Sequence, residues 1–355
     1  MIRWRDGVVR ELRGGTADAV GLVVSTAGGD VPAVAYPALV GQPVPGDRVL
    51  LNVTALELGL GTGGAALVVA LPDRLPADGN DAGHIVKARY TPMQATVLAA
   101  DEQGSPHHRL LRDADSIDGM PVVVADLHSA LTPIVAAVRA SRPSTRVVYV
   151  MSDGGALPLW FSRSVPALRA AGWLDAAVTV GQAFGGDVEA VTVHTGLLAA
   201  RHVLGAELAV VTQGPGNLGT GTRWGFSGVA SGEAVNAVNV LGGRAVAALR
   251  VSEVDERPRH RGLSHHSLTA LGRVALTPAD VAVPDLPGEF GAQVRAACAE
   301  LARLHRLVEV PTDGLLDVLR DTPVPLSSMG RGLDDDPAYF LGCAAAGRHA
   351  TSLLA

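Results

Sequence analysis

The stretch PVVVAD, residues 121–126, decides the fold. A short run that is apolar at every position, and therefore on both faces, is typical of a strand in a parallel sheet covered by helices on both sides. The same pattern recurs in RVVYVMSD (146–153), DAAVTVGQ (175–182), AELAVVTQ (206–213) and RAVAALRVSE (244–253), with helical stretches between them. Strands that alternate with helices predict an α/β fold with a mostly parallel, doubly wound sheet.

The first 80 residues or so show a different pattern. Short β-branched runs such as AVGLVVST and DRVLLNVTAL are separated by Gly, Pro and Asp. Turn residues spaced at roughly ten-residue intervals predict a small all-β, barrel-like domain. The polar, Pro- and Gly-rich stretch 71–83 marks its end. We therefore expect an all-β domain over 1–80 and an α/β domain over 81–355.

Composition excludes several classes of protein. Of the 355 residues, 48 % are hydrophobic and 18 % charged, so a large core is available. The net charge of −6 and the lack of a basic stripe argue against nucleic-acid binding. No apolar run approaches the ~18 residues of a membrane span, and the first residues lack the apolar core of a signal peptide. We therefore expect a cytoplasmic protein without nucleic-acid or membrane partners; a homodimer stays open.

Polar residues and glycines follow the predicted strands at their carboxyl ends. In open α/β sheets, ligands bind beyond this edge. Asp126 and His128 follow the first strand, and Asp153 follows the second. A glycine-rich loop, 213–228, follows the fourth strand, and DERPRHRGLSHHS, residues 255–267, follows the fifth. We therefore expect these segments to line one cleft.

The glycine loop and the arginines form the predicted anion site. Backbone N–H groups, hydroxyls and guanidinium forks all bind phosphate or carboxylate. The residues are Gly214, Gly216, Gly219, Thr220, Gly221, Thr222, Arg257, Arg259 and Arg261. GPGNLG also matches the dinucleotide pattern G-x-G-x-x-G, but the acidic residue expected about 20 positions later is missing. A nicotinamide-nucleotide-binding oxidoreductase is therefore a weaker alternative.

Imidazoles and carboxylates at the same edge indicate acid–base chemistry. Histidine titrates near neutral pH, and a carboxylate orients it or holds a metal. The candidate catalytic residues are Asp126, His128, Asp153, His260, His265 and His266. A divalent metal bound by carboxylates and a histidine is an open alternative, with the metal unknown. The competing interpretation is structural: the aspartates cap helices, and Asp255 and Glu256 pair with the arginines at the surface.

These features favour an enzyme, a hydrolase or transferase, acting on an anionic small molecule that is phosphorylated or nucleotide-like. The alternative is a non-catalytic ligand-binding or regulatory protein that uses the same cleft. A sensor needs only the anion-binding groups, whereas acid–base residues beside them favour catalysis.

Five stretches carry a resemblance to a known family: GHIVKARYTPMQ (83–94), MSDGGALP (151–158), TQGPGNLGTGTRWGFSG (212–228), RHRGLSHHS (259–267) and SSMGRGLDDDPAYF (327–340). They resemble an uncharacterised bacterial family, common in actinobacteria, that bears only a domain-of-unknown-function label. The resemblance extends over nearly the whole chain. It implies no activity, cofactor or catalytic residue.

Overall fold

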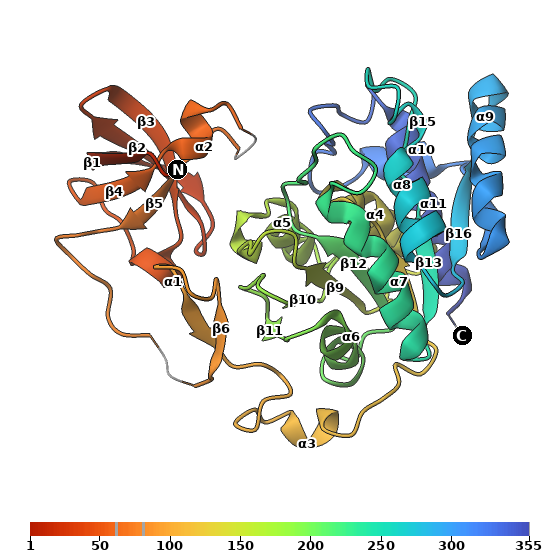
Figure 1. The fold of residues 1–355 in the computed structure, drawn as a ribbon, viewed down its shortest axis with the longest axis horizontal. Coiled ribbons are helices and arrows are strands. Elements are labelled where there is room, and N and C mark those ends of the chain that lie inside the picture. Colours follow the sequence, from red (N-terminus) through yellow and green to blue (C-terminus); the bar gives the residue numbers. More distant parts are fainter. Residues whose placement is uncertain (61–62, 80–81, 355) are drawn as a thin grey trace. The chain divides into compact units, whose positions relative to one another are not determined.

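The computed structural model describes residues 1–60, 63–79 and 82–354. The chain divides into two compact units, Met1–Val97 and Leu98–Ala355 (Figure 1). The boundary predicted near residue 80 falls at residues 80 and 81, outside the described residues. The structural division comes later, after Val97, so residues 82–97 belong to the first unit.

The first unit contains a closed β-barrel with the strand order β1-β2-β3-β5-β4. Its strands are β1 (Trp4–Gly15), β2 (Val20–Thr26), β3 (Gly29–Ala35), β4 (Arg48–Asn52) and β5 (Ala66–Ala70), with short helices α1 (Pro37–Val40) and α2 (Thr54–Glu57). Alternate residues of β2, such as Leu22 and Val24, fill the barrel because strand side chains point to opposite faces. The all-β prediction is confirmed. A separate hairpin of β6 (Ile85–Lys87) and β7 (Ala95–Val97) follows.

The second unit is built on an eight-stranded sheet with the order β11-β10-β9-β12-β8-β13-β16-β17. Every neighbouring pair is parallel, which confirms the doubly wound α/β prediction. The strands are β8 (Pro121–Val124), β9 (Val147–Ser152), β10 (Ala176–Thr179), β11 (Val188–Glu189), β12 (Leu208–Gln213), β13 (Arg244–Ala248), β16 (Asp280–Asp285) and β17 (Arg306–Pro311).

Helices cover both faces of this sheet (Figure 1). One contacting group consists of α4 (Leu131–Ser141), α5 (Ser164–Ala170), α10 (Leu315–Arg320) and α11 (Pro337–Ser352). Another consists of α3 (His108–Leu111), α6 (Val193–His202), α7 (Ala230–Val240) and a π-helix, Ala270–Val274, which continues α8 (His265–Thr269). Helix α9 (Gly288–Cys298) contacts β16. It also contacts a small antiparallel ribbon formed by β14 (Val251–Ser252) and β15 (Gly262–Leu263). No helix of the described residues is long and apolar enough to cross a membrane.

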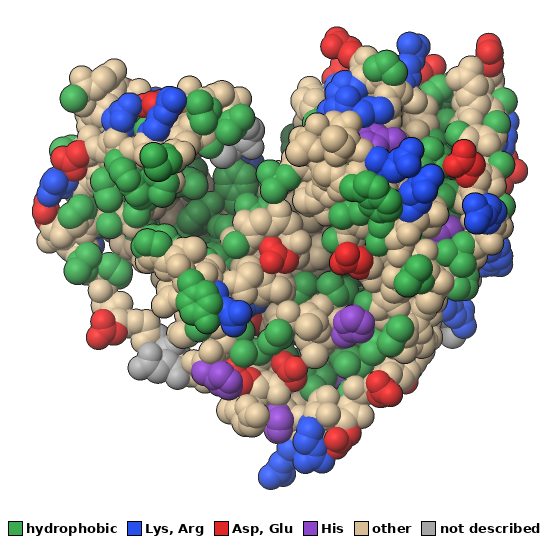
Figure 2. All heavy atoms as spheres, viewed as in Figure 1, with side chains coloured by type: hydrophobic (Ala, Val, Ile, Leu, Met, Phe, Trp, Pro, Cys, Tyr) green, Lys and Arg blue, Asp and Glu red, His purple; other side chains and the backbone are tan. Residues whose placement is uncertain are grey.

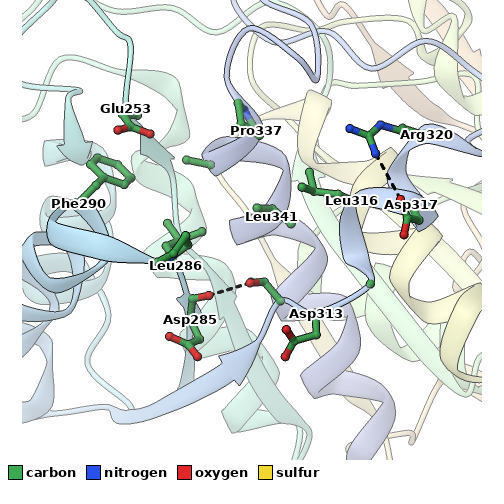
Figure 3. Close-up of a pocket in the computed structure, with 14 residues that line it drawn as sticks. Glu253, Asp285, Leu286, Phe290, Asp313, Leu316, Asp317, Arg320, Pro337 and Leu341 are labelled. Carbon is green, nitrogen blue, oxygen red and sulfur yellow. Dashed lines mark hydrogen bonds and ion pairs between the residues drawn. The ribbon is translucent and has the colours of Figure 1, made fainter.

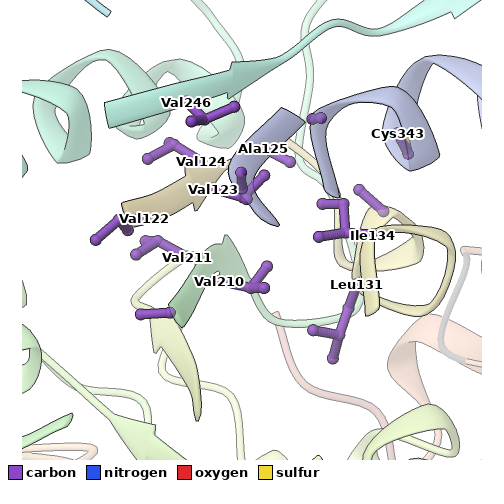
Figure 4. Close-up of a cluster of buried hydrophobic side chains, with 14 of the residues drawn as sticks. Val122, Val123, Val124, Ala125, Leu131, Ile134, Val210, Val211, Val246 and Cys343 are labelled. Atoms are coloured by element: carbon purple, nitrogen blue, oxygen red, sulfur yellow. The ribbon is translucent and has the colours of Figure 1, made fainter. Parts of the chain in front are cut away.

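The core lies between the central strands and the helices packed on them. Figure 4 shows Val123 and Val210 of the sheet facing Leu131 and Ile134 of α4. All four side chains are buried, and each contributes about 1.5–3 kcal/mol by leaving water. Helix α11 approaches α4 so closely that a Cβ on Gly347 would overlap the carbonyl oxygen of Ile134.

The strand order creates a crevice between β8 and β13. From β8 the chain runs through α4 to β9, on one side, whereas from β13 it runs to β16, on the other. Right-handed connections that diverge in this way lie on opposite faces of the sheet. Such a switch point, beyond the carboxyl ends of two neighbouring strands, is where doubly wound proteins bind ligands.

Candidate functional site

Two buried charges lie at this crevice. Asp126 follows β8 by two residues and Arg250 follows β13 by two residues. Their exposed fractions are only 8 % and 4 %. Asp126 Oδ2 lies 3.6 Å from Arg250 Nη1, and the Arg250 backbone N–H donates to Ser267 Oγ at 3.0 Å. Buried charges require a partner, so the two residues stabilise each other.

Three histidines cluster beside this pair. The ring centroids of His260, His265 and His266 lie 4.5–5.0 Å apart. Ser264 caps α8 by accepting from the His266 backbone N–H, and its Oγ lies 2.8 Å from His260 Nδ1. The His266 ring also stacks on Phe226 at 3.7 Å, with the planes 6° apart. Ser264 and Phe226 therefore fix the orientation of two of the three rings. In Figure 2, basic side chains and a histidine gather over α8.

Electrostatics keep two of these imidazoles neutral. Burial, helped by the Arg250 cation, lowers the pKa of His260 to about 3. Burial and the neighbouring cationic groups lower the pKa of His265 to about 4. Burial on its own raises the pKa of Asp126, but His266 and Arg250 outweigh it, and the net pKa lies below its ordinary value. At neutral pH the Asp126 carboxylate is therefore ionised, and the rings of His260 and His265 are neutral.

Unpaired polar atoms also gather here. Within the described residues, three buried side-chain atoms make no hydrogen bond: Asp126 Oδ2, Gln213 Oε1 and His265 Nε2. Gln213 is tied to Asp126, because its Nε2 donates to the Asp126 carbonyl oxygen at 2.6 Å. Asp126 and Gln213 also line a small cavity of about 10 Å³. Buried polar atoms without a hydrogen bond are uncommon, and these three make the region a candidate site, although Asp126 Oδ2 has the charged Arg250 nearby.

The glycine loop approaches the cluster through Arg259. A Cβ on Gly221 would lie 3.7 Å from Arg259 Nη2, so this guanidinium packs against the loop tip. Thr220 and Thr222 are used inside the turn, where their hydroxyls lie 3.0 Å apart and Thr222 Oγ1 accepts from Gly225 N–H at 3.1 Å. The predicted hydroxyl donors thus stabilise the loop itself.

The other predicted glycines have different surroundings. Gly216 and Gly221 take positive φ, 103° and 79°, which favours glycine. Gly219 pairs with Phe226 in an isolated antiparallel bridge. Gly214 is buried against Met151, so its backbone is not exposed to a ligand in the solvent.

The remaining two arginines have other partners. Arg257 binds Asp255 through Nε at 2.8 Å and Nη2 at 2.7 Å, and Arg331 also contacts Asp255 at 3.1 Å. These cations hold the pKa of Asp255 far below its ordinary value, with Arg257 the main cause. Arg261 is exposed and lines a groove with Glu253 and Glu256. The competing surface-pairing interpretation therefore describes Arg257, whereas Arg259 lies at the loop.

His128 and Asp153 bind other segments. His128 Nδ1 lies 3.0 Å from Tyr149 Oη and its Nε2 lies 2.7 Å from Ser162 Oγ, and burial lowers its pKa to about 4. Asp153 accepts from the N–H groups of Gly155 and Ala156 through Oδ1 and of Gln182 through Oδ2. Among the described residues, His260, His265 and His266 alone form a group of three or more potential metal ligands. The structure does not place His128 or Asp153 in it.

Three residues of this region were not among the site residues predicted from the sequence. Arg250, Gln213 and Phe226 belong to apolar or glycine-rich stretches and match no motif. Arg250 could have been predicted, because it follows β13 by two residues, just as Asp126 follows β8 by two residues.

A larger hollow lies elsewhere at the sheet edge (Figure 3). This cavity of about 740 Å³ is lined by Glu253, Asp285, Asp313 and Asp317, and Arg320 is paired with Asp317 at 3.2 Å. A neighbouring groove carries Glu256 and further carboxylates. Concentrated negative charge repels an anion, so size alone does not identify the candidate site.

The chain belongs to the family described as "Protein of unknown function (DUF3866)", whose model matches residues 32–347. The resemblance noted from the sequence is therefore confirmed. No curated protein and no solved structure matches the chain.

Proposed function

We propose that this chain, from a family without an assigned activity, is an enzyme that binds an anionic small molecule beyond β8 and β13 and hydrolyses or transfers a group on it. The observation that carries the proposal is Arg259, which lies against Gly221 and beside the histidine cluster. The carbonyl oxygen of Arg259 accepts from the His265 backbone N–H at 2.9 Å, which joins the two features.

Arg259 supplies charge for the anion. Arg250 and Arg257 are paired with carboxylates, whereas Arg259 makes no ion pair with any described residue. Arg259, Gly221 and Thr222 are exposed, and the N–H groups of Gly221 and Thr222 donate to no acceptor in the described part of the chain. A guanidinium beside unpaired N–H groups suits a phosphate or carboxylate.

The histidine cluster supplies acid–base chemistry. A neutral imidazole with an unpaired Nε2 is able to accept a proton, and His265 has both properties. The Asp126–Arg250 pair holds His266 in place beside it. These properties favour hydrolysis or transfer on a phosphorylated or nucleotide-like substrate, in which the attacking water or hydroxyl group must lose a proton.

Binding and turnover are tested separately. Inorganic phosphate, pyrophosphate and AMP are titrated by calorimetry, and hydrolysis is followed with p-nitrophenyl phosphate and bis(p-nitrophenyl) phosphate. We expect at least one anion to bind. Arg259→Ala then weakens binding by about 10- to 100-fold, since it removes a charged hydrogen bond. Arg261→Ala, two residues along the same segment, is the matched control and keeps the affinity.

Equal affinities for the two arginine variants, or no anion binding at all, would contradict the proposed site. Anion binding that needs Arg259 but comes with no turnover of either ester favours the non-catalytic ligand-binding protein over the enzyme.

A further inference from the structure

We propose that His260, His265 and His266 bind one divalent transition-metal ion of the zinc type. This inference goes beyond the proposed anion binding and does not depend on it, but it replaces His265 as the proton acceptor, because the Nε2 lone pair then binds the ion. One ring nitrogen of each histidine lies within 4.8 Å of the others. Three nitrogens around a tetrahedral zinc lie ~3.3 Å apart, because each Zn–N bond is about 2.0–2.1 Å. Closing the site therefore requires the ring nitrogens to approach one another by up to about 1.5 Å.

The ring of His260 is already oriented as a ligand. It is buried, and its Nδ1 lies 2.8 Å from Ser264 Oγ. When Nδ1–H donates to this oxygen, Nε2 carries the lone pair. Metal-binding histidines commonly donate their second N–H to a fixed acceptor, which sets both tautomer and orientation.

The ring of His266 lies between two charged groups. Its Nδ1 is 3.1 Å from Arg250 Nη1 and 3.4 Å from Asp126 Oδ2. Because the Arg250 guanidinium only donates, its hydrogen bond to His266 Nδ1 places the lone pair on Nδ1 and the proton on Nε2 in the metal-free cluster. A metal on Nε2 requires the proton to move to Nδ1; Arg250 Nη1 must then withdraw, and Nδ1–H donates to Asp126 Oδ2. That oxygen otherwise has no hydrogen-bond partner in the described residues. A carboxylate, a histidine and a metal in series is a recurrent arrangement in zinc proteins.

His265 contributes the second unpaired atom. Its Nε2 is buried and makes no hydrogen bond within the described chain. A single ion would therefore provide a partner for His265 Nε2 directly and for Asp126 Oδ2 through His266. Without an ion, both atoms lack a hydrogen bond, which is why we favour the metal.

The surroundings also select the class of ion. Three imidazoles suit zinc, cobalt, nickel or copper, whereas magnesium and calcium prefer oxygen ligands. The cations of Arg250, Arg257 and Arg259 oppose a metal ion. Asp126 offsets Arg250 and Asp255 offsets Arg257, whereas Arg259 has no carboxylate partner among the described residues. Three protein ligands leave a fourth tetrahedral position open, as in catalytic zinc sites. An anion held by Arg259 is able to occupy that position.

The experiment measures metal binding directly. Tag-free protein is stripped with a chelator and titrated with Co²⁺, whose visible spectrum reports its ligands, and Zn²⁺ affinity is obtained by competition with a chromophoric chelator. We expect one ion per chain, confirmed by elemental mass spectrometry. His265→Ala should lower the affinity about tenfold or more. His194→Ala, at an exposed position of α6, is the matched control and should change nothing.

Asp126→Asn separates an orienting role from ligation: we expect about 10- to 100-fold weaker binding with one ion still bound at saturation. Far less than one ion on the wild-type protein, or equal affinities for the wild type and a folded His265→Ala, would overturn the metal site. The wild-type titration decides even if the variant misfolds. Anion binding in the stripped protein without any metal uptake removes this inference and keeps the proposed function, and metal uptake without anion binding does the reverse.

Discussion

Removing the Asp126 carboxylate should leave Arg250 buried without its counter-charge. The charged atoms are 3.6 Å apart, and at an effective dielectric constant of about 20 their attraction is about 4–5 kcal/mol. Desolvation of both groups offsets most of this gain when the pair is intact. Losing one partner keeps the desolvation cost of the other. We therefore expect Asp126→Asn and Arg250→Met each to destabilise the larger unit by about 3 kcal/mol.

The double variant should lose much less stability than the sum of the losses of the two single variants. With both charges gone, no uncompensated ion is buried, so we expect a total loss of about 1–3 kcal/mol and a coupling energy of about 3–5 kcal/mol. Native-state hydrogen exchange of the β8 and β13 amides measures the larger unit by itself. The exposed pair Arg112–Asp113 is the control, with a coupling below about 1 kcal/mol. Additive effects of Asp126→Asn and Arg250→Met would refute the buried-pair interpretation.

Two further predictions concern packing and pH. Gly347→Ala places a Cβ against the Ile134 carbonyl oxygen and should destabilise the larger unit by about 2–4 kcal/mol in thermal unfolding. The control is Gly272→Ala, where the nearest atom to the new Cβ is 3.4 Å away and the loss of stability should be under about 1 kcal/mol. Equal effects of the two variants would contradict the tight contact of α11 with α4. Because burial lowers the pKa of His128 from 6.5 to about 4, the unfolded chain takes up a proton at a higher pH than the folded chain. The free energy of unfolding should therefore fall between pH 6.5 and 4, by up to about 3 kcal/mol. His128→Gln should show a smaller fall in melting temperature over this range, and parallel pH profiles of the variant and the wild type would contradict this role of His128.

Much of the fold could be predicted because strand patterns are local. The valine runs of β8 and β9 are apolar on both faces, and burial on both faces is the property that places a strand inside a covered parallel sheet. Strand β16 was not recognised, since its sequence DVAVPD carries charged ends and a proline. The order of the strands could not be predicted, because β12 lies between β8 and β9 although it follows both in the chain.

The candidate site shows more clearly what the sequence alone could not predict. Arg257, Arg259 and Arg261 alternate along one segment, and nothing in their spacing distinguishes them. In the folded chain, Asp255 neutralises Arg257, Arg261 lies in the groove with Glu253 and Glu256, and Arg259 is left against the glycine loop. Which charge stays available depends on where each backbone turn points the side chain.

By itself, the sequence determined the two architectures, the approximate strands and the edge of the sheet where polar residues collect. These follow from periodicity within short windows and from the rule that parallel strands end at one edge. Only the tertiary structure decided that Asp126 and Arg250 form a buried pair, that three histidines share one cluster, and that His128 and Asp153 bind elsewhere. The physical reason is that such contacts join segments far apart in the chain, and the strand order that brings β8 beside β13 is set by the packing of the whole sheet.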